Sequence, residues 1–222
     1  MIGKFSSRGN STEPVTGLSP VAWYRYQQGL GVSTGALISS WNDQSGNNNT
    51  LVATGTKTPT MQADGSLLFD GADDSMQAVY TLNNPFTRYI LGKQVVWTAN
   101  RFWASGGTSN CTLQQATTSP QVRINDGAGV AFVSVPIDTY CVLTAMYNGA
   151  ASLVRINLDT ASTGTLSGIN AGGLTLAAGT SQAASFSNIQ VKEIIDFPIA
   201  HTNVTTQNAV IVYLGSVGGV NL

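Results

Sequence analysis

The chain has 222 residues and a formal net charge of −1; charged residues make up only 9% of it, against 42% hydrophobic residues. This balance argues against nucleic-acid binding, since no Lys/Arg cluster could neutralise several phosphates. No run of about twenty apolar residues could cross a membrane as a helix. A chain of this length can bury a large core as one β-sandwich without disulfides or metals.

The first segment, residues 1–19, is polar and contains three glycines and one proline. We predict an extended N-terminal arm here and a single domain over residues 20–222. The arm could be a floppy leader or an anchor that lies over a neighbouring subunit, and no feature of the segment decides between them. A surface so poor in charge is easier to explain if copies of the chain or other partners cover it, which predicts a homo-oligomer.

The domain begins with the β-rich run P-V-A-W-Y-R-Y after residue 19. Later strands are predicted at residues 76–80, 89–98, 102–105, 112–115, 121–125, 130–135, 140–147, 152–159, 174–178 and 189–197. They are short, recur about every ten residues and are separated by Gly/Asn turns. This rhythm is typical of a two-sheet antiparallel sandwich.

Two segments near the end of the chain have a clear internal pattern. In S-L-V-R-I-N-L-D (152–159), Val154, Ile156 and Leu158 alternate with polar residues, which predicts a half-buried strand with Arg155 on its polar face. Residues 203–214 fit a short helix capped by a side chain, although its β-branched residues leave a strand as the alternative. The residues expected to cap, face inward and end this helix are Asn203, then Val204, Ile211 and Leu214, then Gly215.

Two motifs lie within residues 39–77: W-N-D-Q-S-G-N at 41–47 and F-D-G-A-D-D at 69–74. Their pairing, about thirty residues apart, resembles the concanavalin A-like (laminin-G-like) jelly-roll family found in bacterial surface proteins and phage virion proteins. The resemblance implies an all-β, two-sheet jelly roll with a short C-terminal helix. Tryptophan and phenylalanine would anchor strands, while aspartate and glycine would shape turns. These structural residues are Trp41, Asp43, Gly46, Phe69, Asp70 and Gly71.

Some sandwiches of this architecture are glycoside hydrolases, which need two carboxyl groups beside the scissile bond. The chain has only two glutamates, Glu13 in the arm and Glu193, and no E-x-D-x-x-E pattern. Glu193 and Asp196 are three apart and point to opposite faces of a strand. We therefore predict no catalytic residues and no enzyme. Glu193 is predicted on the apolar face, where its carboxylate accepts from the Trp41 indole or a backbone amide.

Metal sites have little support. Asp43, Asp70, Asp73 and Asp74 could supply oxygen ligands to Ca²⁺, but tight turns need the same residues, and we favour turn chemistry and no cofactor. Cys111 and Cys141 have no metal-binding spacing and are read as buried thiols, with a disulfide left open.

Sugar binding would need aromatic faces and planar amides on an exposed rim. The main candidates are Trp103, beside a Gly-Gly turn, together with Tyr24, Asn47 and Asn48. Tyr26 and Trp97 are further candidates.

The leading functional hypothesis is a non-enzymatic structural protein of a phage virion, a capsid decoration or head-surface component held by its arm and sandwich surfaces. This hypothesis rests on the resemblance and implies capsid or other virion proteins as partners, with assembly in the host cytoplasm. The alternative is a carbohydrate-binding module for host recognition that uses the rim loops of the sandwich.

Overall fold

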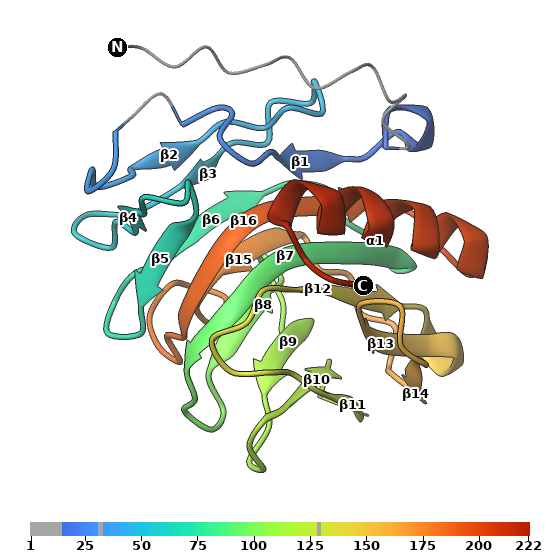
Figure 1. Ribbon diagram of the computed structural model, residues 1–222. Coiled ribbons are helices and arrows are strands. Elements are labelled where there is room, and N and C mark those ends of the chain that lie inside the picture. Colours follow the sequence, from blue (N-terminus) through green and yellow to red (C-terminus); the bar gives the residue numbers. More distant parts are fainter. Residues whose placement is uncertain (1–14, 31–32, 128–129) are drawn as a thin grey trace.

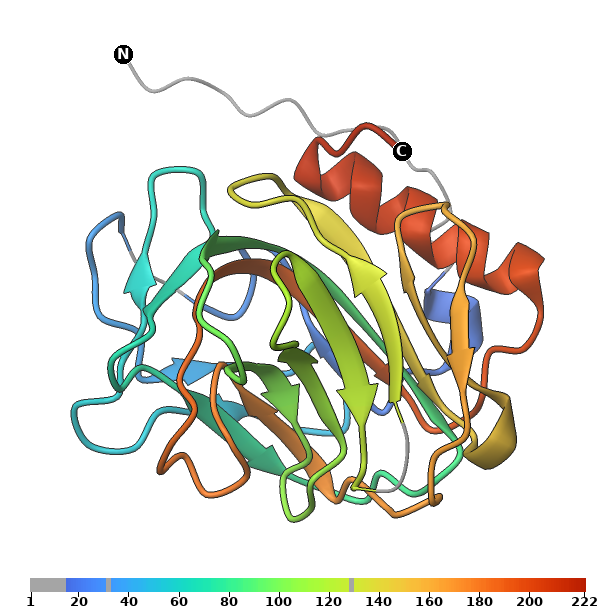
Figure 2. The same cartoon turned by 90° about the horizontal axis from the view of Figure 1, so that it is seen from below.

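The computed structural model describes residues 15–30, 33–127 and 130–222. Two antiparallel sheets pack face to face, and the helix α1 (Val204–Gly218) lies on the outer side of one of them (Figures 1 and 2). The predicted all-β sandwich is confirmed. Among the described residues, no helix is long and apolar enough to cross a membrane.

Sheet A lies next to α1, and its long central strands are β7 and β16. A short strand, β1 (Ala22–Tyr24), pairs with the end of β16. The other strands follow in spatial order as β14 (Ser162–Gly164), β13 (Ser152–Ile156), β12 (Cys141–Tyr147), β7 (Phe86–Val96), β16 (Asn188–Phe197), β5 (Leu67–Asp70) and β4 (Thr60–Met61).

Sheet B forms the second layer and has eight strands. In spatial order they are β11 (Val130–Ser134), β10 (Gln121–Asn125), β9 (Thr112–Gln115), β8 (Phe102–Ser105), β15 (Gly173–Leu176), β6 (Met76–Val79), β3 (Leu51–Val52) and β2 (Ser40–Trp41). Two short 3-10 helices, η1 (Thr16–Leu18) and η2 (Gly149–Ala151), complete the described elements.

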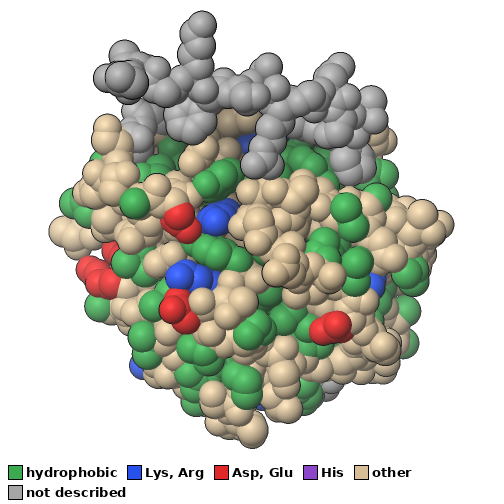
Figure 3. All heavy atoms as spheres, in the orientation of Figure 1, with side chains coloured by type: hydrophobic (Ala, Val, Ile, Leu, Met, Phe, Trp, Pro, Cys, Tyr) green, Lys and Arg blue, Asp and Glu red, His purple; other side chains and the backbone are tan. Residues whose placement is uncertain are grey.

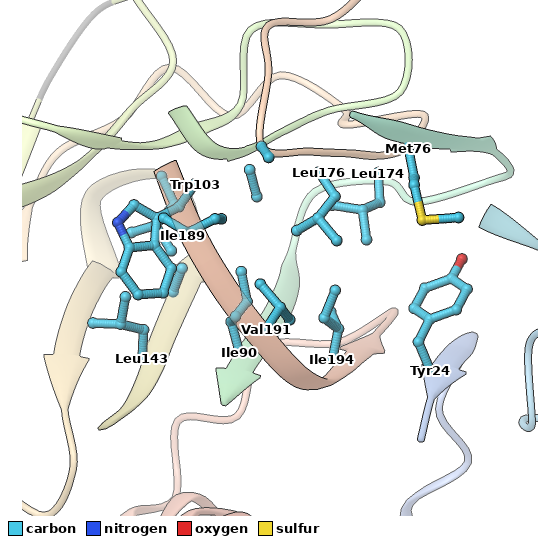
Figure 4. Packing of buried hydrophobic residues seen from close by; sticks show 14 of the residues in the cluster. Tyr24, Met76, Ile90, Trp103, Leu143, Leu174, Leu176, Ile189, Val191 and Ile194 are labelled. Atoms are coloured by element: carbon cyan, nitrogen blue, oxygen red, sulfur yellow. The ribbon is translucent and has the colours of Figure 1, made fainter. Parts of the chain in front are cut away.

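Sheet A has a hydrophobic cluster on each side. The larger cluster fills the space between the two sheets and includes Ile189, Val191 and Ile194 of β16 (Figure 4). The smaller one lies between sheet A and α1 and includes Ile195 and Phe197 of the same strand. Sheet A is therefore covered by apolar side chains on both faces where α1 lies over it.

A β-bulge in β16 changes which residues of the strand face each cluster. Val191 pairs with Gly92 of β7 and Glu193 with Leu91, so Lys192 has no partner in the ladder. One extra residue reverses the alternation that follows it. Glu193 is thereby moved to the outer face of sheet A, which corrects its predicted place on the inner apolar face.

Most of the predicted strands coincide with observed ones, but the 152–159 prediction needs correction. Strand β13 ends at Ile156, and Asn157 has a left-handed φ of 47°. Leu158 is consequently 38% exposed, while Arg155 is buried under α1, where its guanidinium bonds the Asn208 side chain at 2.9 Å. Val154 and Ile156 are buried in the core as predicted, so the corrections concern Leu158, which lies beyond the strand, and Arg155, which the helix covers.

The C-terminal helix is present, so its strand alternative is wrong. The Oδ1 of Asn203 accepts from the amide of Thr205 at 2.8 Å, which confirms the predicted cap. Ile211 and Leu214 are buried as expected, whereas Val204 is 59% exposed. The helix continues through the predicted stop and ends at a left-handed glycine, Gly219.

The N-terminal arm was predicted over residues 1–19, and residues 1–14 lie outside the described part of the chain. Val15, just before η1, is fully buried in the cluster beneath α1. Among the described residues, packed structure is therefore already present at Val15, before the predicted domain start at residue 20.

Candidate functional site

The helix α1 leaves part of the outer face of sheet A open. Beside its C-terminal half lies a groove of about 540 Å³, which we call the outer-face groove. Its walls come from the segment after β1, the bulge of β16 and α1. Figure 3 looks onto this side of the molecule and shows acidic and basic side chains lying side by side on it. The groove is lined by Arg25, Tyr26, Gln27, Gln28, Glu193, Tyr213 and Val217.

The W-N-D motif builds the first wall of this groove. The buried indole of Trp41 donates to the carbonyls of Arg25 and Gln28 at 3.2 and 3.0 Å. Asp43 Oδ1 accepts from the amide of Trp23 at 2.8 Å. Gly29 follows the wall with a φ of 73°, and a Cβ there would lie 2.7 Å from a backbone oxygen of residue 42. The predicted structural role of Trp41 therefore has a consequence for the groove, because it fixes the backbone of residues 25–28.

Glu193 supplies the carboxylate of the groove and is only 1% exposed. Its Oε1 accepts from the Trp23 indole at 2.6 Å and from the Tyr213 hydroxyl at 3.0 Å, and its Oε2 accepts from the Tyr26 amide at 3.2 Å. Burial raises the pKa of Glu193 above its ordinary value, and these hydrogen bonds offset part of that effect. Acceptance from an indole and a backbone amide was expected, but the indole is that of Trp23, not Trp41.

A second group of polar side chains adjoins Tyr26 and is centred on Lys192. The Lys192 Nζ lies 3.9 Å from the ring centroid of Tyr140 and 5.5 Å from that of Tyr26. The same atom lies 3.5 Å from Asp64 and 3.4 Å from the carbonyl of Gly218 at the end of α1. Lys192 therefore ties the β4–β5 turn, two tyrosines and the helix C-terminus together.

Asp64 is the acidic partner in this group. Burial acts against its charged form, but hydrogen bonds from Ser66 and Tyr140, together with the charge of Lys192, hold the pKa of Asp64 at about 2. The Tyr140 hydroxyl lies 2.6 Å from Asp64 Oδ2, and the Tyr26 hydroxyl donates to the Asp64 carbonyl. Asp64 is thus an anion at neutral pH and keeps both tyrosines in place.

A second depression of about 360 Å³ adjoins the groove, because Gln27 lines both. The side-chain amide of Gln27 donates to the Tyr26 hydroxyl at 3.1 Å. The described lining of this second depression also includes Met61, Gln62 and Gly65 from the β4–β5 hairpin. The two depressions therefore adjoin at Gln27.

Two of the residues predicted to bind glycans lie in the core instead. Trp103 is fully buried and its indole donates to Gln94 Oε1 at 2.6 Å. Figure 4 shows Trp103 beside Ile189 and Leu143. Tyr24 is also fully buried, with its hydroxyl bonded to the carbonyl of Asn49. Neither ring can stack on a sugar, which corrects both predictions; the bulge in β8 turns Trp103 inward despite its Gly-Gly neighbours.

Asn47 and Asn48 are exposed, as a rim-loop site requires. Asn48 has a left-handed φ of 59°. The Asn47 side-chain amide already donates to the carbonyls of Pro20 and Val21, at 3.2 and 3.1 Å. Asn47 also lines a depression of about 530 Å³ beside Trp23. Asn47 contacts residues 20 and 21 before β1, whereas residues 25–28 after β1 line the outer-face groove, and of the further candidates only Tyr26 lines it.

The aspartates considered for Ca²⁺ do not converge as a set. Asp43 uses both oxygens within its own loop and accepts from the amides of Ser45 and Asn49 at 2.8 and 3.0 Å. Asp73 and Asp74 approach Asp70, with ligand oxygens within 4.8 Å of one another.

These oxygens also bond to the turn itself. The Oδ1 of Asp70 accepts from the amide of Ala72 at 2.8 Å, and Asp74 Oδ2 accepts from the amide of Asp70 at 3.0 Å. Gly71 has a φ of 79° in the same turn. These contacts explain the aspartates of the F-D-G-A-D-D motif as residues that form the turn.

The remaining reactive side chains lie inside the fold. Cys111 and Cys141 are both buried free thiols, and burial raises the pKa of Cys111 to about 11. His201 is 3% exposed, with Nδ1 2.9 Å from the Tyr89 hydroxyl, and burial lowers the pKa of His201 to about 4. These groups do not line the outer-face groove.

No protein-family model and no curated protein sequence matches this chain. Solved structures do resemble it in fold. A Trypanosoma rangeli sialidase matches with a TM-score of 0.63 and 11% identity over 89% of this chain and 33% of its own. The same enzyme in complex with sialic acid gives 0.54 and 10% over 84% and 33%. A GH54 α-L-arabinofuranosidase gives 0.61 and 12% over 82% and 51%.

The chain thus spans one third to one half of the length of these structures. At this level of identity the similarity demonstrates the β-sandwich fold of the concanavalin A-like type, which confirms that part of the resemblance. The finding also overturns two predictions. A non-enzymatic virion structural protein was expected, whereas these similar structures are named as carbohydrate-processing enzymes, and none of them is a phage protein.

Proposed function

We propose that this chain binds carbohydrate and that the outer-face groove is the binding site. The observation that carries the proposal is the composition of the groove. The Tyr26 and Tyr213 side chains lie in one open hollow with the amides of Gln27 and Gln28 and the charges of Arg25 and Glu193. Sites that bind organic ligands combine such apolar faces with a few fixed polar groups.

The chemistry of a sugar explains why this combination matters. A pyranose or furanose ring has an apolar face of C–H bonds and a rim of hydroxyl groups. Tyrosine offers a rigid ring for the first and a hydroxyl for the second. The Tyr26 hydroxyl is fixed by Asp64 and Gln27, so the ring is held in place before a ligand arrives. Preorganised side chains lower the entropy cost of binding.

The structural neighbours support a sugar as the ligand. They are a sialidase, its complex with sialic acid and an arabinofuranosidase. Because the chain corresponds to only a part of each, these neighbours support carbohydrate as the ligand class more directly than any one substrate.

The experiment is a binding screen of the purified chain against plant, bacterial and animal glycans by affinity electrophoresis, followed by calorimetry on the hits. Tyr26→Ala should weaken binding at least about tenfold, since removing an aromatic residue at the centre of a binding site typically costs about 2 kcal/mol or more. Release of reducing sugar in the same mixtures reports hydrolysis.

The matched control is Asn48→Gly, which removes an exposed amide from the rim loop and retains a residue that accepts its left-handed backbone. It should bind like the wild type. Binding lost in Asn48→Gly and retained in Tyr26→Ala would move the site to the rim loop. Absence of binding to every glycan class would contradict the proposed function.

A further inference from the structure

We infer that the ligand of the outer-face groove is an uncharged glycan chain of several sugar residues that extends from the groove into the adjoining depression beside Gln27. This inference rests on the proposed function and specifies its ligand class. Two observations carry it. The charges around the groove are matched in pairs, and a second depression adjoins the groove at Gln27.

The described charges around the groove occur as neighbours of opposite sign. Lys192 lies 3.5 Å from Asp64, and on the far side of Tyr140 the Lys93 Nζ lies 2.7 Å from Asp138. A charged ligand would have to compete with these existing partners. The field of paired charges falls off quickly with distance, so it gives little attraction to a free ion.

The same is true inside the groove. Arg25 lies over the ring of Trp23, with its guanidinium carbon 4.3 Å from the ring centroid, and its positive charge stabilises the Glu193 carboxylate. An acidic sugar at this position would lie beside the Glu193 carboxyl group, and a basic sugar would lie beside Arg25. Neutral hydroxyl groups, by contrast, can bond the exposed side-chain amides of Gln27 and Gln28 without disturbing either pairing.

The length of the ligand follows from the two depressions that adjoin at Gln27. Gln27 lines both the 540 Å³ groove and the 360 Å³ depression, and its exposed side chain bonds the Tyr26 hydroxyl and packs against Gly65, so a ligand that occupies both depressions must pass over this side chain. A single sugar could contact Tyr26 and Tyr213 within the groove. Reaching Gln62 on the far side of Gln27 requires a chain of linked sugars.

The test compares neutral and acidic oligosaccharides of matched length, from one to six residues, by calorimetry. Neutral chains should bind more tightly with length by at least about tenfold between the monosaccharide and the hexasaccharide. Their affinity should change by less than about twofold between about 10 mM and about 1 M sodium chloride, although the screening length falls from about 30 Å to about 3 Å. Acidic chains should bind at least about tenfold more weakly.

The matched variants are Gln28→Lys and Gln28→Glu, because Gln28 is exposed, lines the groove and contributes its backbone carbonyl to Trp41. Gln28→Lys should gain salt-sensitive binding of acidic chains, and Gln28→Glu should not. Tighter, salt-sensitive binding of acidic chains by the wild type, or affinity independent of length, would overturn this inference and leave carbohydrate binding intact. Absence of any glycan binding would remove both proposals.

Discussion

Strand β16 carries two buried carboxylates three residues apart, and the two have different surroundings. Asp196 faces the space between the sheets and accepts from Arg88 Nε and Nη2 at 2.7 and 2.6 Å and from the Tyr80 hydroxyl at 2.5 Å. Glu193 faces outward and accepts from two side chains and one amide that are all neutral. One carboxylate has an ionic partner in direct contact; the other lines a groove.

This difference separates a structural ion pair from a functional candidate. Arg88 also donates to the carbonyls of Ser105 and Gly173, so the inner pair connects sheet A to strands of sheet B. Neither Asp196 nor Arg88 lines the outer-face groove, whereas Glu193, which is as deeply buried as Arg88, does. A raised pKa in a cleft, as at Glu193, is the more usual mark of a binding or catalytic site.

Removing Arg88 should therefore have the largest effect on stability. Arg88→Met leaves Asp196 as an uncompensated buried charge, and we expect the unfolding free energy to fall by about 3–5 kcal/mol. Urea denaturation at neutral pH measures this loss.

The control is the double variant Arg88→Met, Asp196→Leu, which removes both charges. It should recover at least half of the loss, since an apolar pair of similar size avoids the desolvation of an isolated ion. A double variant no more stable than Arg88→Met would mean that packing around Arg88, and not the unpaired charge, causes the loss.

The inner pair also illustrates what the sequence could and could not predict. The alternation of apolar and polar residues, the turn motifs and the strand rhythm were sufficient for the sandwich, and the Asn203 cap was sufficient for the start of α1. Arg88 lies one residue before the predicted strand at 89–98. No local sequence pattern indicates that an arginine at this position is buried between two sheets. Its partner is 108 residues away.

The groove was harder to predict because it depends on a bulge. Strict alternation placed Glu193 with Ile189 and Val191, and the extra residue at Lys192 reversed that assignment. The signal that could have indicated it was the pair Lys192–Glu193 itself, since two charged residues in succession interrupt an otherwise apolar strand. Tyr26 was a candidate from its aromatic character, but its neighbours came from α1 and the β4–β5 turn, which only the fold brings together.

A smaller effect is expected at Glu193, and it should depend on pH. Glu193→Gln keeps the shape of the side chain but directs an amide N–H at one of three donors, which should cost about 1–2 kcal/mol. Because burial raises the pKa of Glu193 above 4.5 in the folded state, the folded chain binds this proton more tightly than the unfolded chain. Wild-type stability contributed by this group is therefore lost as pH rises from about 4.5 through the raised pKa.

Denaturation at a series of pH values tests this sign. The glutamine variant lacks the titrating group, so the stability gap between variant and wild type should narrow as pH rises. A gap that widens would indicate that the folded state lowers the pKa of Glu193, contrary to the desolvation argument.

The smallest effect should come from Lys192, the basic residue next to Glu193 on the outer face. Its contacts are partly exposed and shared, with Asp64 at 3.5 Å, the Gly218 carbonyl at 3.4 Å and the Tyr140 ring at 3.9 Å. Lys192→Met keeps the apolar stem and removes the charge, so the unfolding free energy should fall by about 1 kcal/mol or less. Lys93→Met removes a charge whose partner Asp138 is 68% exposed, and should change the unfolding free energy by less than about 0.5 kcal/mol.

A loss at Lys192 as large as that at Arg88 would remove the distinction between the two faces of β16, because the outer charges would then hold the fold together as the inner pair does. A loss within the expected range would leave the outer face free to meet a ligand at little cost to stability.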